Sequence, residues 1–208
     1  MDFTKFVSML ENHGLFFAAA DKLGDPFEGS ISAANWQSRK DFLRAIKATD
    51  EFSEKHNKDK AEFYKRNRKS VLINSWHMNE YESAAMWKLY TQSNESIGVQ
   101  STFELLRRCL DGNIQIGEVE YIDFERDVIP ESHALYPFMH KMKSFEHERE
   151  LRALIWETGL QRVDEGVWAR VDLQLLIQNI YVAPSSPTWF CELVSKLVKR
   201  YDLHFNVT

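Results

Sequence analysis

The feature that most constrains the fold is a long charged segment, Trp36–Lys69, which contains neither glycine nor proline. It carries eleven Lys and Arg against six Asp and Glu, a local charge of +5, so the chain's net charge of −5 becomes −10 outside it. Apolar side chains recur among these charges, and the pattern predicts one long helix or a helical hairpin. This arm is either a solvated element packed by one apolar edge or an element that contacts phosphates.

Outside the arm, short apolar runs alternate with amphipathic stretches. The runs are typical of strands at 15–19, 71–76, 97–101, 114–121, 151–156, 179–183 and 203–207. Helical spacing recurs at 2–13, 83–90, 103–110 and 189–201. The sequence therefore predicts an α+β fold, a single mixed-sheet domain over residues 1–208 with flanking helices and a helical insertion at about residues 32–70.

The overall charge excludes a polycation that coats nucleic acid or an anionic membrane with its whole surface. No run approaches the ~18 to 20 apolar residues that span a bilayer, and the first residues lack the pattern of a signal peptide. Cys109 and Cys191 are too few for a disulfide framework or a four-thiolate zinc site. We therefore expect a soluble cytoplasmic protein without a membrane partner.

Two polar clusters lie beside the early strands. The first is the loop Asp25-Pro26-Phe27-Glu28, whose carboxylates could face a cleft, although Asp25 could instead fix a turn through backbone hydrogen bonds. The second follows the strand at 71–76, where α/β proteins often bind ligands, and it contains Ser75 and His77. For His77 the alternative is a hydrogen-bonded core histidine.

A third polar cluster covers residues 143–152. If the strand begins this early, alternation places Glu146, Glu148 and Glu150 on one edge of the extended chain. Three carboxylates on one edge repel each other unless they meet a cation, a metal or a substrate hydroxyl. We therefore expect a functional role for at least one of these glutamates.

Taken in order, these blocks resemble the bacterial family of the domain of unknown function 2971. The resemblance runs over residues 15 to 155, and it implies family membership without an established reaction. It rests on Leu15-Phe16-Phe17, Asp25–Glu28, Trp76-His77, Glu82–Trp87 with Tyr90, Ile97-Gly98-Val99 and Ser144–Arg152.

The block order also resembles, at the level of the fold, the ADP-ribosyltransferases, in which a late Glu-x-Glu enters a strand. This resemblance implies an ADP-ribosyltransferase-like or NAD-cleaving enzyme with NAD as its cofactor and no metal. Glu150 would act beside the ribose 2-hydroxyl, Glu148 would orient the acceptor, and His77 or Ser75 would hold the ribose. Trp87 or Tyr90 would stack on the nicotinamide, although their helical spacing favours core packing. The remaining substrate-binding candidates are Asp25, Glu28 and Arg152.

Two other classes of function stay open. A metal-dependent nuclease would hold Mg²⁺ with Asp25, Glu28, Glu148 and Glu150 and would follow the phosphates of a nucleic acid with the arm. A non-catalytic binding module would pair the same carboxylates with Arg149, Arg152 and Lys143 to tie strands together. The expected partner is thus a small nucleotide or a nucleic acid. In the enzymatic interpretations, Glu28, His77, Glu148 and Glu150 converge on one cleft.

Overall fold

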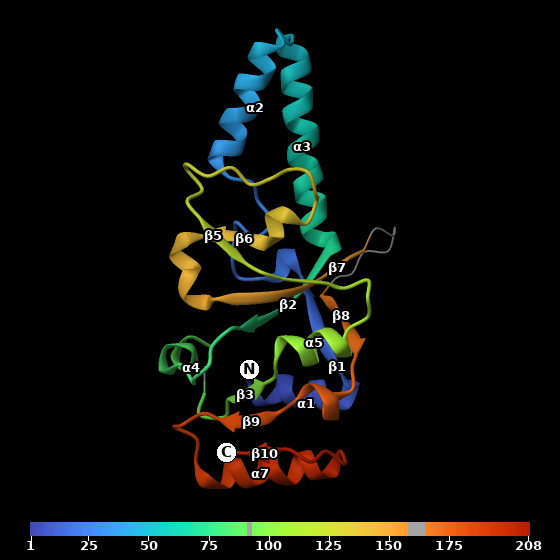
Figure 1. Cartoon of the computed structure of the whole chain (residues 1–208), viewed down its shortest axis with the longest axis vertical. Helices are drawn as coiled ribbons and strands as arrows, with labels where there is room; N and C mark the ends of the chain where they lie inside the picture. The colour runs from blue at the N-terminus through green and yellow to red at the C-terminus, as the bar shows by residue number, and fades with distance from the viewer. Residues whose placement is uncertain (91–92, 158–164) are drawn as a thin grey trace. The chain divides into compact units, whose positions relative to one another are not determined.

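The computed structural model describes residues 1–90, 93–157 and 165–208 and has the α+β fold that the sequence predicts (Figure 1). Its helices are α1 Phe3–Asn12, α2 Ala33–Ala45, α3 Asp50–Ser70, α4 Ala84–Tyr90, α5 Phe103–Cys109, α6 Leu173–Leu176 and α7 Thr188–Arg200, with 3₁₀ turns η1 Ala20–Lys22, η2 Tyr136–Met139 and η3 Lys143–Glu148. Its strands are β1 Gly14–Ala19, β2 Val71–His77, β3 Ile97–Gln100, β4 Gln115–Glu118, β5 Glu120–Ile122, β6 His140–Met142, β7 Glu150–Trp156, β8 Gly166–Arg170, β9 Asn179–Val182 and β10 Asn206–Val207.

Contacts within the chain divide it into two compact units, each assembled from segments that are distant in the sequence. The hairpin unit consists of Phe17–Met78 and Gln115–Val167, and the terminal unit consists of Met1–Phe16, Asn79–Ile114 and Trp168–Thr208. No helix in the described part of the chain is long and apolar enough to cross a membrane.

One sheet has five strands in the order β4-β7-β2-β1-β8, and three of them, β4, β7 and β2, lie wholly within the hairpin unit. β7 runs antiparallel to both β2 and β4, and five of its seven residues are buried, as expected for a central strand, although Glu150 and Arg152 interrupt its apolar residues. The side chains packed beside it, which form one cluster of the core, are Ala20, Val71, Ile73, Leu135, Phe138 and Leu154. The pairing of β2 with β7 matters most for function, because it places Ser75 opposite Arg152 and His77 opposite Glu150.

The predicted helical insertion is a hairpin of α2 and α3 (Figure 1). Each helix begins at a capping side chain, since the Ser32 hydroxyl accepts a hydrogen bond from the amide of Asn35 and the Thr49 hydroxyl accepts one from the amide of Phe52. At the base of the hairpin, Glu131 accepts hydrogen bonds from Arg39 of α2 at 2.5 Å and from the Tyr64 hydroxyl of α3 at 2.9 Å. One carboxylate therefore ties both helices to the loop that precedes η2.

The terminal unit contains a mixed three-stranded sheet in the order β10-β9-β3, with β9 parallel to β10 and antiparallel to β3. α7 buries Phe190, Val194 and Val198, and the Phe190 ring lies edge-on to that of Phe3 in α1 at 5.4 Å. Trp87 of α4 lies against Gly98, where an added Cβ would come within 3.2 Å of the indole ring.

Two local expectations were wrong. Residues 143–149 do not extend the strand, because Lys143–Glu148 form the 3₁₀ turn η3 and Arg149 takes a left-handed backbone with φ of 40°. The strand expected at 114–121 is split, because β4 pairs with β7 whereas β5 pairs with β6. The strand β8 and the short helix α6 were not expected at all.

Candidate functional site

The candidate site is a cluster of charged side chains in the hairpin unit, at the end of the β2–β7 pair. It contains the six predicted residues Glu28, Ser75, His77, Glu148, Glu150 and Arg152, and it also contains Lys141 and Tyr121. We call this set the ion cluster. Its members come from the loop after η1 and from β2, β5, β6, η3 and β7.

Arg152 is the centre of the ion cluster, with only 1% of its surface exposed. Its guanidinium donates to both oxygens of Glu28, at 2.7 and 2.9 Å, and to Oε2 of Glu150 at 2.6 Å. It also donates to the backbone carbonyl of Phe138 at 2.6 Å. A buried guanidinium needs this full set of acceptors, because an unpaired buried charge is costly.

Glu28 reaches Arg152 because of the glycine that follows it. Gly29 has φ of +67°, a left-handed conformation that glycine adopts without steric cost. A Cβ at this position would lie 2.2 Å from the ring of Phe138, so the chain can approach Phe138 this closely only without a side chain. The loop after η1 thus brings a carboxylate to an arginine that lies 124 residues away in the sequence.

Glu148 and Glu150 converge on the same lysine. Lys141 Nζ donates to Oε1 of Glu150 at 2.8 Å and makes a short contact with Oε2 of Glu148. The left-handed backbone of Arg149 turns the chain between the two glutamates, and the amide of Met78 donates to the Arg149 carbonyl at 2.9 Å. The strand alternation expected from the sequence would place Glu146 on the same edge as Glu148 and Glu150. In the structure Glu146 is instead exposed in the 3₁₀ turn η3.

The two glutamates differ in their pKa values. Burial favours the neutral form of both carboxyls. For Glu150 this effect is outweighed, first by the charge of Arg152 and then by hydrogen bonds from Glu148, Arg152 and Lys141, so its pKa is lowered. For Glu148 burial and the hydrogen bond to Glu150 prevail over the attraction of Lys141, so its pKa is raised. The pair therefore has one firmly ionised carboxylate and one carboxyl that holds its proton to a higher pH.

The remaining charges and the phenol are also affected by burial. Burial raises the pKa of Glu28, and Arg152 opposes this shift. The hydrogen bonds to Glu148 and Glu150 raise the pKa of Lys141 although burial alone would lower it. The Tyr121 hydroxyl accepts a hydrogen bond from the amide of Glu150 at 2.8 Å, and burial raises the pKa of this phenol.

His77 lies beside the two glutamates. Its Nδ1 is 2.6 Å from the carbonyl oxygen of Glu148, and since a carbonyl only accepts hydrogen bonds, Nδ1 carries the proton. Its Nε2 is buried and has no hydrogen-bond partner within the described chain. Ser75 is exposed, and its hydroxyl donates to Oε2 of Glu150 at 3.0 Å, so the ion cluster reaches the surface near this serine.

Three predicted site residues lie outside the ion cluster. Asp25 accepts a hydrogen bond from the amide of Phe27 at 2.8 Å, which is the turn-fixing contact considered for it as an alternative. Trp87 and Tyr90 belong to α4 in the terminal unit. The expected partners Arg149 and Lys143 are exposed, and Lys141, which the sequence analysis did not single out, takes the position expected of Lys143.

The ion cluster does not suit a divalent cation. No group of three or more His, Cys, Asp and Glu side chains that could hold a metal is found in residues 1–90, 93–157 and 165–208. Both oxygens of Glu28 are bound by Arg152, and both oxygens of Glu150 are bound by cationic side chains. These carboxylates are therefore compensated by lysine and arginine, and Mg²⁺ would have to displace them.

Comparison of the chain with protein-family models, curated proteins and solved structures found no match. The resemblances to the domain of unknown function 2971 family and to the ADP-ribosyltransferases therefore stay predictions.

Proposed function

We propose that the chain is an enzyme that cleaves the bond between nicotinamide and ribose in NAD, with Glu148 as its acid–base residue. The observation that carries the proposal is the unequal setting of two neighbouring carboxyls: Glu150 contacts both Arg152 and Lys141, whereas the cationic contact of Glu148 is Lys141, and the pKa is lowered for Glu150 and raised for Glu148. Neighbouring carboxyls whose environments separate their pKa values are a recurrent sign of acid–base chemistry.

The charge count of the ion cluster explains this inequality. Glu28, Glu148 and Glu150 supply three potential negative charges, whereas Arg152 and Lys141 supply two positive ones. Arg152 pairs with Glu28 and Glu150, while Glu148 and Glu150 share Lys141, so the cluster has one carboxyl more than it has cations. Of the two that share Lys141, Glu148 has the raised pKa, and we call it the surplus carboxyl. A surplus carboxyl ionises readily only when positive charge comes close to it.

NAD cleavage supplies such a charge. The nicotinamide ring is a pyridinium cation, and its departure leaves positive charge on the ribose in an oxocarbenium-like transition state. The C1′–N1 bond breaks, and its electron pair leaves with nicotinamide, which becomes neutral. Glu148 has released its own proton to solvent beforehand, because the nearby pyridinium favours its ionised form. The oxygen of a water molecule or another acceptor then bonds to C1′ as its O–H bond breaks, and that proton passes to the carboxylate of Glu148.

The other members of the ion cluster have positioning roles in this proposal. The ADP-ribosyltransferase resemblance places Glu150 at the ribose. We assign it instead to holding Lys141 and Arg152 in position, because both its oxygens accept hydrogen bonds and only 9% of its side chain is exposed. Ser75 is the group available to the ribose, through its exposed hydroxyl, whereas Nε2 of His77 is buried and reaches a substrate only if the side chain is uncovered.

The test is nicotinamide release from NAD by the full chain, measured by chromatography, for wild type, Glu148→Gln and Glu146→Gln. We expect Glu148→Gln to lower the rate by roughly 10²- to 10⁴-fold, the usual range for loss of an acid–base group. Its melting temperature should not fall below that of wild type, because glutamine is neutral like the protonated form of Glu148 that the folded chain favours. Glu146→Gln removes an exposed carboxyl from the same turn and should leave the rate unchanged.

Two results would contradict the proposal. One is folded wild-type protein that releases no nicotinamide above the spontaneous rate. The other is release by Glu148→Gln at the wild-type rate, which would show that Glu148 takes no part in the chemistry.

A further inference from the structure

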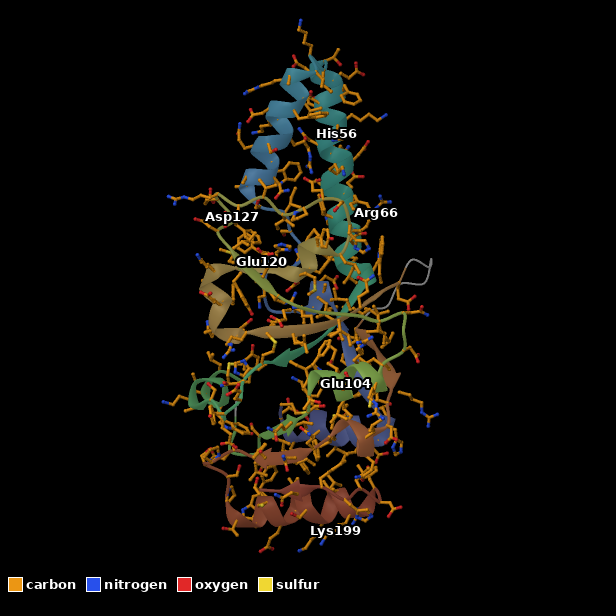
Figure 2. All side chains as sticks on the ribbon, in the orientation of Figure 1. His56, Arg66, Glu104, Glu120, Asp127 and Lys199 are labelled. Carbon is orange, nitrogen blue, oxygen red and sulfur yellow. The ribbon has the colours of Figure 1, made fainter. Side chains whose placement is uncertain are left out.

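A stripe of aromatic and cationic side chains runs along one face of α3, away from the ion cluster residues. Its members recur at helical spacing, and they are Phe52, His56, Lys60, Phe63 and Arg66. The positions from 52 to 66 cover about 21 Å of helix axis at 1.5 Å per residue. In Figure 2, His56 lies towards the free end of the hairpin and Arg66 lies nearer the sheet. We call this set the α3 stripe.

The aromatic rings of the α3 stripe are arranged with the cationic groups. The rings of Phe52 and His56 are stacked, with centroids 5.9 Å apart and planes at 17°. Lys60 Nζ lies 6.0 Å from the centre of the Phe63 ring, at the outer limit of a cation–π contact. Phe52 is 52% exposed, so the ring that stacks on His56 is also open to a ligand.

The stripe surrounds an open hollow of about 280 Å³, lined by His56, Asp59, Lys60, Phe63 and Arg66. Asp59 is the single acidic group in this lining. Lys60 is 3.9 Å from Glu131, but that carboxylate already accepts shorter hydrogen bonds from Arg39 and Tyr64, so the ammonium of Lys60 remains available to a ligand.

The charge around the stripe is locally positive. Residues 60–70 carry five Lys and Arg against one Glu, a balance of +4 in a chain of net −5. Arg68 and Lys69 occupy the last turn of α3, where positive charge stabilises the helix dipole. Their charge therefore has a structural explanation and does not by itself indicate a ligand. Lys60, Lys65 and Arg66 lie before that turn, and the helix dipole does not account for them.

We infer that the α3 stripe binds single-stranded nucleic acid. Aromatic rings that alternate with cations fit the two features of such a strand, because bases stack on exposed rings while Lys and Arg neutralise the phosphodiester backbone. A duplex hides its bases and offers nothing to Phe52. The inference is independent of the proposed NAD chemistry, since it depends on α3 alone.

The test uses fluorescence anisotropy of labelled oligo(dT) and oligo(U) of about 16 nucleotides, titrated with the full chain from ~50 to ~200 mM salt. We expect Lys60→Gln/Arg66→Gln to weaken binding and to reduce the slope of log K against log salt by about 1.4, since each lost single-strand contact contributes about 0.7. Phe52→Ala should weaken binding roughly 5- to 150-fold, the effect of losing one stacked base. Comparison of the affinities for oligo(dT) and oligo(U) shows whether the stripe prefers DNA or RNA.

The matched control is Lys40→Gln/Arg44→Gln, which removes two exposed cations from α2 and leaves the stripe intact. This variant should keep at least most of the wild-type affinity. Equal losses in the two double variants would overturn the inference, because binding would then follow overall charge alone. It would also be overturned if the wild-type chain bound no oligonucleotide at low salt or bound a duplex of the same length equally well. Melting curves of each variant exclude loss of fold as the cause.

Discussion

Replacement of Glu150 by glutamine is the sharpest test of the ion cluster. Glu150 accepts hydrogen bonds from Lys141 at 2.8 Å, from Arg152 at 2.6 Å and from Ser75 at 3.0 Å. Glutamine has nearly the same shape but only one oxygen, so its amide nitrogen must face either Lys141 or Arg152. In both orientations a buried cation loses its acceptor and meets another donor.

The cost follows from the burial of these groups. Arg152 is 1% exposed and Lys141 is 6% exposed, so water cannot replace the lost carboxylate oxygen. Breaking a buried ion pair by removing one partner costs about 3 to 5 kcal/mol. For a chain of this length each kcal/mol corresponds to about 2 to 4 °C, so the melting temperature should fall by roughly 6 to 20 °C.

The assay is urea unfolding followed by tryptophan fluorescence, with thermal melting in parallel. Glu146→Gln is the control, because this exposed carboxyl is in the same segment and its loss should change the free energy of unfolding by less than about 0.5 kcal/mol. If Glu150→Gln unfolds within about 1 kcal/mol of wild type, the value of an ordinary hydrogen bond, Glu150 does not hold the network and our assignment of its role is wrong.

Two further outcomes can be stated. Because the pKa of Glu148 is raised above 4.5, its contribution to stability is full below that pH and is lost as pH rises through the raised value; the free energy of unfolding of Glu148→Gln relative to wild type should therefore increase as the pH rises from 4.5 through that range, measured by urea unfolding. A constant difference across that range would refute the surplus-carboxyl argument. Gly29→Ala should destabilise the chain by more than about 1 to 2 kcal/mol, since it combines a left-handed backbone with a Cβ 2.2 Å from Phe138. Gly24→Ala, in the same loop and with no atom within 4 Å, should be nearly neutral in the same melting experiment.

The sequence was informative where a local pattern determines the structure. Apolar runs located β2 and β7, and the absence of glycine and proline from 36–69 located the two-helix arm. The polar groups at the end of β2 and before β7 were also found, because they interrupt apolar runs. Antiparallel pairing then brings Ser75 and His77 to Arg152 and Glu150, as register rules allow.

Other features had no local signal. Lys141 lies in β6, a strand of three residues that is too short to show a period. Arg149 takes a left-handed conformation that its residue type does not favour, so the turn between Glu148 and Glu150 could not be anticipated. The division into two units is not visible in the sequence either. Each unit combines segments that are far apart in the chain, and no segment of linker composition separates the units.

The turn at Arg149 explains why two glutamates of similar burial differ so much. In a continuous strand, residues 148 and 150 would share one face and would compete for the same cations on equal terms. The left-handed residue instead leaves Glu150 as the first residue of β7, within reach of Arg152, and sets Glu148 in η3 with Lys141 as its cationic neighbour. Arg152 is thus committed to Glu28 and Glu150, and Glu148 shares Lys141 with Glu150, so three carboxyls meet two cations. The reactivity proposed for Glu148 is therefore a consequence of the structural role of Glu150, and the two roles must be tested on separate variants.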